Sequence, residues 1–465
     1  MQEQAATAFS QGANVSRRRL ILGYVVMVAT AVGLFTLVRM YGETLFASRP
    51  QPAAVAAPHP VPGTDAFLHV LLALAAIVIL SRGLGKVFAT FGQPRVIGEV
   101  VAGIALGPSL LGRIAPGAMT FILPDTAAPL LGVIAQLGVI LYMFLVGLDL
   151  NAELLRSRGH ATVAISHASI VVPFLLGAVL ALWLYPRLAP GGVRFTSFAL
   201  FMGVAMAITA FPVLARILTD RRMGKTPLGV VALSCAAADD VTAWCLLAFM
   251  VGLAKAEVSA ALRTVFLALG YIALMFGVVR PVAIRMLAAD REEELFPGAV
   301  SWVLVALLLS ALVTEAIGIH AIFGAFLLGA IIPHDSAVAR LFTHKLEDVV
   351  TILLLPAFFA YTGMRTQIGL IAGPEAWLIC AAIIVAATVG KFGGTLAAAR
   401  FTGLDWRTSA ALGILMNTRG LMELIVLNIG LDLGIISPTL FAMMVLMALA
   451  TTLATTPILR RLSPA

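Results

Sequence analysis

Charged side chains are scarce in this sequence. Asp, Glu, Lys and Arg make up 12% of its 465 residues, whereas hydrophobic residues make up 61%. A soluble globular domain carries about 25% charged residues, so a chain this poor in charge cannot cover a surface that faces water. The composition excludes a disordered chain, a coiled coil and a collagen. It indicates instead a protein whose solvent is mostly lipid.

Cysteine and clustered basic charge are also rare. Cys235, Cys245 and Cys380 lie in apolar stretches without metal-ligand spacing, so we expect them to pack in the interior. The net charge is +8, yet the only run of three basic residues is Arg17 to Arg19. A nucleic-acid-binding protein needs such charge gathered on one face. Basic residues placed singly between apolar stretches are typical of membrane-protein loops.

Long apolar runs are what the sequence has in abundance. A membrane-spanning helix needs about 20 mostly apolar residues. We expect spans near 20–38, 66–81, 94–111, 128–149, 159–184, 196–218, 227–253, 262–288, 299–316, 318–333, 349–364, 374–398, 408–430 and 437–458. If every span crosses, 21 of the 31 Lys and Arg residues share a side with the N-terminus and 8 lie opposite. Positive residues concentrate in the cytoplasm, so we predict an integral protein of a bacterial inner membrane with both termini cytoplasmic.

The two ends of the chain carry separate expectations. Residues 20–38, after three arginines, are a retained extra helix or a cleaved signal; the apolar run exceeds the 7–15 residues of a signal core, which favours the helix. The linker at 48–63 is rich in Pro and Ala and should be poorly ordered. We expect no soluble domain after the last span.

Two adjacent aspartates stand deep inside one apolar segment. Asp239 and Asp240 follow about a dozen residues of the 227–253 run. An ionisable residue at such depth is costly and points to function. Neighbours on a helix point about 100° apart, so each carboxylate can have its own partner. The sequence therefore predicts a proton- and cation-binding site here; a purely structural bridge between helices is the alternative.

Other charges are also placed where lipid or protein should surround them. Lys391 lies within 374–398 and needs an acidic partner such as an aspartate, unless it snorkels to the cytoplasmic face. Arg419 and Glu423 are four residues apart and can pair on one helix. For these two and for Glu99, a structural ion pair and a direct role both stay open. Glu315 and His320 are weaker candidates.

Two apolar segments contain polar interruptions. The run Thr209, Ala210, Phe211, Pro212 interrupts the 196–218 segment, where proline removes a backbone donor. The run Asn417, Thr418, Arg419, Gly420 interrupts the 408–430 segment. Broken backbone at membrane depth is tolerated where it lines a cavity or is buried in protein. Two broken helices in corresponding halves of a chain indicate the binding site of a transporter.

These motifs together resemble the second monovalent cation–proton antiporter family. The residues that carry the resemblance, in family order between about 66 and 458, are Pro94 to Glu99, Gly103 to Pro108, Thr209 to Arg216, Asp239-Asp240, His320 to Phe326 and Asn417 to Leu424. The stretch Thr209 to Arg216 looks most similar to plant and fungal potassium-type exchangers and their bacterial relatives. The missing C-terminal nucleotide-binding domain distinguishes the chain from ligand-gated potassium efflux systems.

The resemblance implies a fold and an assembly. The fold is all-α and polytopic, with thirteen helices, inverted repeats and two crossed broken helices; residues 1–65 would add a tail, one extra helix and a linker. Family members form homodimers, here through residues 66–149 and 297–366. The ion-transport core would comprise 159–254 and 374–459, joined by a linker helix at 262–288.

The resemblance also implies roles for single residues. Asp240 would bind the transported cation or the proton, with Thr209 beside it, and Asp239 would pair with Lys391. Thr209 to Pro212 and Asn417 to Arg419 would form the crossing, and Glu99 and Glu423 would be supporting charges. An Asp-Asp pair usually accompanies electrogenic exchange in this family.

The function expected is secondary active antiport of sodium or potassium against protons by alternating access. It needs no cofactor and is not enzymatic. A cation channel is one alternative, but strict proton coupling would exclude it. An intramembrane aspartyl protease is another, but its two carboxylates must face each other from different helices, whereas Asp239 and Asp240 are consecutive on one.

Overall fold

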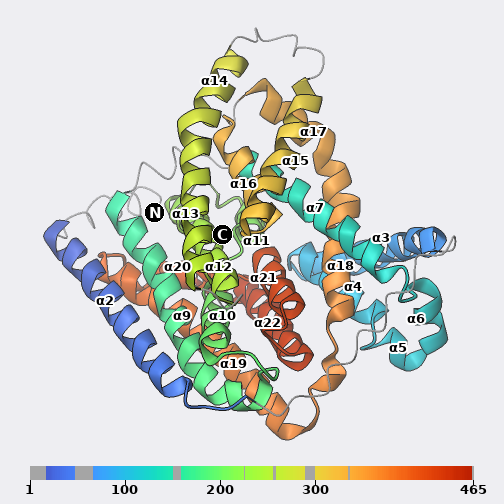
Figure 1. The fold of residues 1–465 in the computed structure, drawn as a ribbon, viewed down its shortest axis with the longest axis horizontal. Helices are drawn as coiled ribbons and strands as arrows, with labels where there is room; N and C mark the ends of the chain where they lie inside the picture. Colours follow the sequence, from blue (N-terminus) through green and yellow to red (C-terminus); the bar gives the residue numbers. More distant parts are fainter. Residues whose placement is uncertain are drawn as a thin grey trace.

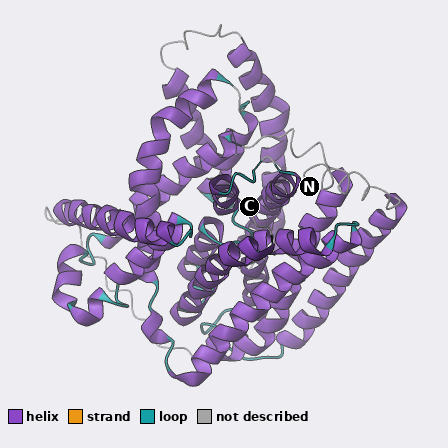
Figure 2. Ribbon diagram, turned by 180° about the vertical axis from the view of Figure 1, so that it is seen from behind, coloured by secondary structure: helices purple, strands orange, loops and turns teal. Residues whose placement is uncertain are grey.

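The computed structural model describes residues 17–47, 66–149, 159–224, 226–254, 258–288, 299–333 and 336–462. Within these ranges the chain is helical and contains no strand (Figures 1 and 2). The α-helices are α2 (Arg17–Gly42), α3 (Ala66–Thr90), α4 (Arg95–Leu106), α5 (Leu111–Ile114), α6 (Pro116–Ile122), α7 (Ala128–Leu148), α9 (Gly159–Leu188), α10 (Phe195–Ala207), α11 (Phe211–Asp220), α12 (Pro227–Ala254), α13 (Val258–Leu274), α14 (Arg280–Ala288), α15 (Ala299–Ile317), α16 (Ala321–Ile331), α17 (Ala337–Val349), α18 (Leu355–Arg365), α19 (Gly373–Phe401), α20 (Trp406–Met416), α21 (Leu421–Asp432) and α22 (Pro438–Leu462). Turns of π-helix at Met275–Val279 and Val350–Leu354 continue α13 into α14 and α17 into α18.

The all-helical membrane fold expected from the composition is confirmed, but the count of thirteen spanning helices is not. Among the described residues, eleven helices are long and apolar enough to cross a membrane, or twelve when the bent pair α20–α21 is one span. The aspartate-bearing α12 and the 11-residue α16 are not among them. Interruptions and buried charge lower the length or the hydropathy of the segments that build the interior, which is why a count by length and hydropathy falls short.

Both expected interruptions break a helix. The first lies between α10 and α11, where Ile208 and Ala210 are extended and Pro212 stands in the first turn of α11. The second lies between α20 and α21, whose axes differ by 42°. The Ala210 N–H donates a hydrogen bond of 3.0 Å to the Thr418 carbonyl. The two breaks therefore touch, and each satisfies backbone groups that the other exposes.

The helices pack in two groups. A scaffold group comprises α3, α4, α7 and α15 to α18, and a core group comprises α9 to α12 and α19 to α22. In Figure 1 the scaffold group lies at the upper right and the core group at the lower left. The helix α13 contacts α12 of one group and α15 of the other. This packing agrees with the expected division of the chain, which stays a prediction as a division into functional domains.

Glycines allow close approach inside the scaffold group. A Cβ on Gly147 of α7 would lie 2.3 Å from the Phe326 carbonyl oxygen, and one on Gly329 of α16 would lie 2.3 Å from the Phe144 oxygen. These distances are too short for any other residue, so the backbones of α7 and α16 touch directly. Without a hydrophobic driving force in lipid, small residues at such crossings hold helices together through close packing.

The additional N-terminal helix lies on the core group. In Figure 1, α2 runs along α9 at the edge of the molecule. Tyr24 meets the His167 ring edge-on at 5.2 Å, and Phe35 meets Phe174 at 5.6 Å. Just beyond the helix, the Glu43 carboxylate accepts a hydrogen bond from Thr196 of α10. The expected linker at 48–63 lies outside the described residues, and whether 20–38 is retained stays a prediction.

Candidate functional site

Asp239 lies at the middle of α12 and is completely buried. Its Oδ1 accepts a hydrogen bond of 2.7 Å from Ser166, and its Oδ2 accepts one of 2.8 Å from Ser169. The Thr209 hydroxyl lies 2.9 Å from the same Oδ2. Lys391 completes the shell with an ion pair of 2.9 Å. Four donors from four different positions therefore saturate this carboxylate.

Lys391 is also fully buried, which excludes the snorkelling alternative. The Nζ atom of this α19 residue donates to Asp239 Oδ2 and to the Ala207 carbonyl at the end of α10. A buried ammonium is tolerated only with such partners. The structure thus brings together the pair that the resemblance implied.

Asp240 follows on the same helix and has a different environment. It is 1% exposed, and neither carboxylate oxygen accepts a hydrogen bond from any described residue. Ion pairs printed by the geometry involve Asp239 but not Asp240. A buried carboxylate without a partner is costly, so Asp240 is where a proton or a cation is needed. The expectation that consecutive aspartates have different partners is confirmed.

Thr209 does not lie where we expected it. Its hydroxyl is within hydrogen-bond distance of Asp239 and of the Met416 carbonyl, 3.1 Å away. No hydrogen bond joins it to Asp240 within the described part of the chain. The break places Thr209 against α20, so this residue links the crossing to Asp239 and is a support rather than a direct ligand of Asp240.

Arg419 secures the crossing from the second break. Its side chain is fully buried and donates from Nη1 to the Ala205 carbonyl at 2.8 Å and from Nη2 to the Met206 carbonyl at 2.7 Å. Because the last carbonyls of a helix lack partners within it, Arg419 and Lys391 together cap α10. Arg419 also pairs with Glu423 at 3.4 Å, as its spacing predicted. Sequence reasoning identified the pair but missed the cap.

Further oxygen atoms at the second break lack partners. Asn417 Oδ1, Thr418 Oγ1 and both carboxylate oxygens of Glu423 are buried and accept no hydrogen bond from described residues. Oxygen atoms are the ligands that hard cations prefer. Among the described residues, no group of three His, Cys, Asp or Glu side chains has the geometry of a resident metal site. Cys235 and Cys380 are buried and free, as expected for packing residues; the side chain of Cys245 lies outside the described part.

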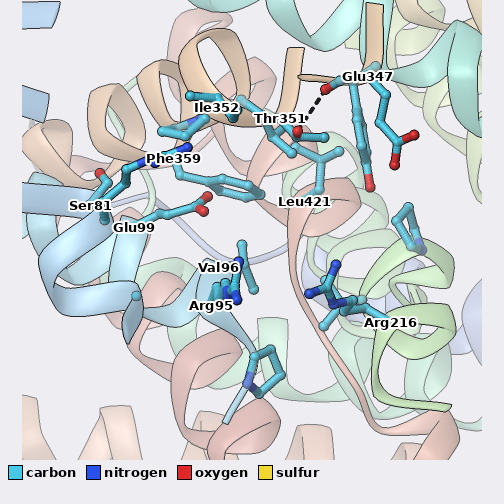
Figure 3. Close-up of a pocket in the computed structure, with 18 of the residues that line it drawn as sticks. Ser81, Arg95, Val96, Glu99, Arg216, Glu347, Thr351, Ile352, Phe359 and Leu421 are labelled. Carbon is cyan, nitrogen blue, oxygen red and sulfur yellow. Dashed lines mark hydrogen bonds between the residues drawn. The ribbon is translucent and has the colours of Figure 1, made fainter. Parts of the chain in front are cut away.

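Glu99 belongs to a cavity rather than to the aspartate site. It is half-buried, not fully buried as we expected. The cavity has a volume of about 360 Å³ and lies between the two helix groups. Scaffold helices contribute Glu99, Tyr142, Glu347 and Phe359, and the core group contributes Pro212, Arg216 and Leu421. Figure 3 shows the Glu99 carboxylate pointing into this space, with Arg216 on the opposite wall.

The cavity ends at the helix breaks. Pro212 and Leu421 lie in the first turns of α11 and α21, directly after the two interruptions. Asp239 and Asp240 are not among the residues that line it. The cavity therefore leads from one membrane face to the crossing without exposing the aspartates.

Ser166 and Ser169 were not foreseen. Both are buried in α9, and their hydroxyls hold the two oxygens of Asp239. Their spacing of three residues places them on one helix face. Two hydroxyls on one face of an apolar span were the available signal, but serine in such helices also commonly bonds to its own backbone.

Comparison with known proteins agrees with this geometry. The transmembrane sodium/hydrogen exchanger family matches residues 71–461. The Na⁺/H⁺ antiporter NhaS4 of Synechocystis is 44% identical over 86% of this chain and 99% of its own length. Cation/H⁺ antiporter 17 of Arabidopsis thaliana is 40% identical over 84% of this chain, and K⁺/H⁺ antiporter 1 of Saccharomyces cerevisiae is 35% identical over 85%.

The chain spans about half the length of the plant and yeast relatives, 48% and 47% respectively. The sodium proton antiporter MjNhaP1 of Methanocaldococcus jannaschii has the same fold, with a TM-score of 0.62 over 85% of this chain and 96% of that one at 14% identity. The similarity to plant and fungal exchangers expected from the motifs is confirmed. From the family match over most of its length, the chain belongs to the transmembrane sodium/hydrogen exchangers.

Proposed function

We propose that this protein exchanges sodium or potassium for protons across a membrane by alternating access, and that Asp240 holds the exchanged ion. The observation that carries the proposal is the contrast between two consecutive carboxylates. Asp239 has four donors, whereas Asp240 is 1% exposed and has none among the described residues. A carboxylate in this state gains most from a proton or a cation.

Competition for Asp240 supplies the coupling. A proton and a cation neutralise the same carboxylate, so each excludes the other. An empty Asp240 carries a bare charge, which costs at least about 2.5–3.5 kcal/mol at the centre of a membrane. The core group therefore changes access when Asp240 is loaded and resists the change when it is empty. A gradient of one ion then drives the other.

Asp239 and Lys391 set the charge balance of the site. Their ion pair of 2.9 Å keeps an extra negative and an extra positive charge beside Asp240. Lys391 can release its proton when a cation approaches, which adds a second proton to the exchange. Electrogenic exchange follows from this arrangement, and substitution of either partner should change the stoichiometry.

Orientation, cation and assembly complete the proposal. Arg82, Lys86, Arg95 and Arg216 line the cavity, and positive residues favour the cytoplasmic face. The cavity then opens to the cytoplasm, and Arg365 lies on the outer face. Relatives are named for sodium and for potassium, so both cations are candidates here. The scaffold group is the proposed homodimer contact, and the core group the moving part.

The test is ion exchange in proteoliposomes of the purified protein. A pH dye inside the vesicles reports proton movement while sodium, potassium, lithium and rubidium are titrated at several pH values. We expect Asp240→Asn to abolish cation-dependent proton movement. Glu375→Gln is the matched control, because Glu375 lies on the surface with its side chain 78% exposed.

Two outcomes would contradict the proposal. Exchange by Asp240→Asn at the wild-type rate would remove the assignment of this residue. Cation flux without proton movement in the wild-type protein would favour the channel instead. The geometry gives the protease no support, since the two aspartates lie on one helix and Asp239 is occupied by Lys391.

A further inference from the structure

A polar cluster joins the scaffold group to the core group at one end of their interface. Arg365, the last residue of α18, forms an ion pair of 2.5 Å with Asp432, the last residue of α21. Its Nη1 atom also donates to Asn428 Oδ1 at 2.8 Å. Asn428 Nδ2 in turn donates to the Thr362 hydroxyl on α18 at 2.9 Å. We call these four residues the latch.

The opposite end of the same two helices borders the cavity. Leu355, Pro356 and Phe359 of α18 line it, and so does Leu421, the first residue of α21. Phe359 and Leu421 are both seen beside the cavity in Figure 3. Along one helix pair, the interface is therefore closed by polar contacts at the carboxyl ends and hollow at the amino ends.

We propose that the latch is the gate that closes the scaffold–core interface on the face opposite the cavity, and that it opens when the core changes access. The inference rests on the alternating-access function proposed above. It assigns Arg365, Asn428 and Asp432 a role in conformational balance, as positioning residues distant from the ion site.

The exposure of the latch suits a contact that must break in every cycle. The Arg365 and Asp432 side chains are 23% and 52% exposed. Because water can solvate both groups once they separate, such a pair is weak and reversible. The Lys391–Asp239 pair is 0% exposed on both sides. Separating those groups in a low-dielectric interior is far more costly, so that pair stays within the core group while the latch opens.

The latch crosses between groups, whereas a second ion pair does not. Arg187 of α9 and Glu375 of α19 lie 3.8 Å apart and both belong to the core group. Opening the scaffold–core interface leaves their distance unchanged. Removing the Glu375 carboxylate is thus a matched control for removing the Asp432 carboxylate.

The test measures access to the cavity directly. Thr351, which lines the cavity, is replaced by cysteine in a protein whose three native cysteines are changed to alanine. The protein is placed in nanodiscs, which leave both faces accessible, and the rate of reaction with a charged maleimide is followed. The variants are Asp432→Asn, Arg365→Gln, the control Glu375→Gln and the charge exchange Arg365→Asp with Asp432→Arg.

Loss of the latch should favour the state in which the cavity is closed. We expect Asp432→Asn and Arg365→Gln each to slow labelling of Thr351→Cys by roughly two- to fivefold, the range of a partly exposed ion pair. Glu375→Gln should leave the rate unchanged, and the charge exchange should restore much of it. Unchanged labelling in both latch variants, or an equal change in Glu375→Gln, would overturn the inference.

The result is separable from that of the transport assay. Labelling needs no ion exchange, so the variants are also measured in an Asp240→Asn background, where the same change in rate is expected. Failure of exchange by the wild-type protein would contradict the proposed function. Failure of the labelling change would contradict the latch alone.

Discussion

Replacing Lys391 with methionine keeps the length and the apolar stem of the side chain but removes its ammonium group. Asp239 then loses its ion pair of 2.9 Å, and the Ala207 carbonyl loses its donor. Both groups stay buried, because Asp239 is 0% exposed and α10 ends inside the protein. The hydroxyls of Ser166, Ser169 and Thr209 still reach Asp239 and partly compensate.

The size of the effect follows from this environment. Removing one partner of a buried ion pair costs about 3–5 kcal/mol. The three remaining hydroxyls place Lys391→Met near about 3 kcal/mol, the lower end of that range. An unfolding entropy of about 2.1 cal/mol/K per residue over 465 residues amounts to about 1 kcal/mol/K, so the melting temperature should fall by about 3 °C. Helices that stay folded in detergent reduce this entropy and enlarge the shift.

A double-mutant cycle isolates the pair. Asp239→Asn alone should also lower the melting temperature, since it leaves Lys391 unpaired. The double variant removes both charges and should melt within about 1–2 °C of the wild type, because a neutral replacement of a buried pair is often harmless. Glu375→Gln, which breaks a surface pair, should shift it by less than about 1 °C.

The assay is thermal unfolding of purified protein in detergent, followed by size exclusion with fluorescence detection. Additive losses in the double variant would refute the reasoning, because additivity would mean that Lys391 and Asp239 do not interact. A wild-type melting temperature for Lys391→Met would refute it as well. Either result would also remove the physical basis for the saturated state of Asp239.

Three further predictions concern the contacts around the site. Arg419→Lys keeps the charge but loses the planar fork that spans the Ala205 and Met206 carbonyls; one lost charged hydrogen bond, worth about 1.5–3 kcal/mol, should lower the melting temperature, and an unchanged value would contradict the cap. Gly147→Ala places a Cβ 2.3 Å from the Phe326 oxygen and should cost about 1–3 kcal/mol, whereas Gly270→Ala, with nothing within 4 Å, should not; equal melting would contradict the close approach of α7 and α16. A hydrogen bond from Thr196 and the charge of Arg39 lower the pKa of Glu43, so its tie between α2 and α10 is present at neutral pH and weakens as the pH falls through that pKa; crosslinking of Glu43→Gln should show the weaker attachment at neutral pH and no further loss in acid.

The sequence alone predicted the unusual residues of the site and the places where helices break. Asp239, Asp240 and Lys391 stand out because an apolar segment with a charge at its middle is rare. Pro212 and the polar run from Asn417 mark the two breaks for the same local reason. The turn near Glu315 also falls where the sequence placed it, between Ile317 and Ala321, and the Ala321 N–H donates to the Glu315 carboxylate at 2.8 Å.

What the sequence could not predict depends on contacts between distant segments. Ser166 reaches Asp239 across 73 residues, and Arg419 reaches Ala205 across 214. Neither distance in sequence leaves a periodic signal, because helical periodicity reports one face and not what covers it. The position of Glu99 in a cavity, away from the aspartates, has the same origin. Its helix belongs to the scaffold group, and only the packing of α4 against α18 decides what its carboxylate faces.

The division of labour between the two aspartates follows from how α10 ends. Its last three carbonyls, from Ala205 to Ala207, are taken by Arg419 and Lys391. The end of a helix carries partial negative charge, so a helix that stops inside a membrane needs positive charge at that point. Two cations held at a helix end would be costly without an anion, and Asp239 supplies it for Lys391 and Glu423 for Arg419. Asp240 lies one residue further, about 100° around α12, beyond the reach of this network. The same break that demands the cations therefore leaves one carboxylate without a partner, and that carboxylate can take an ion from either side.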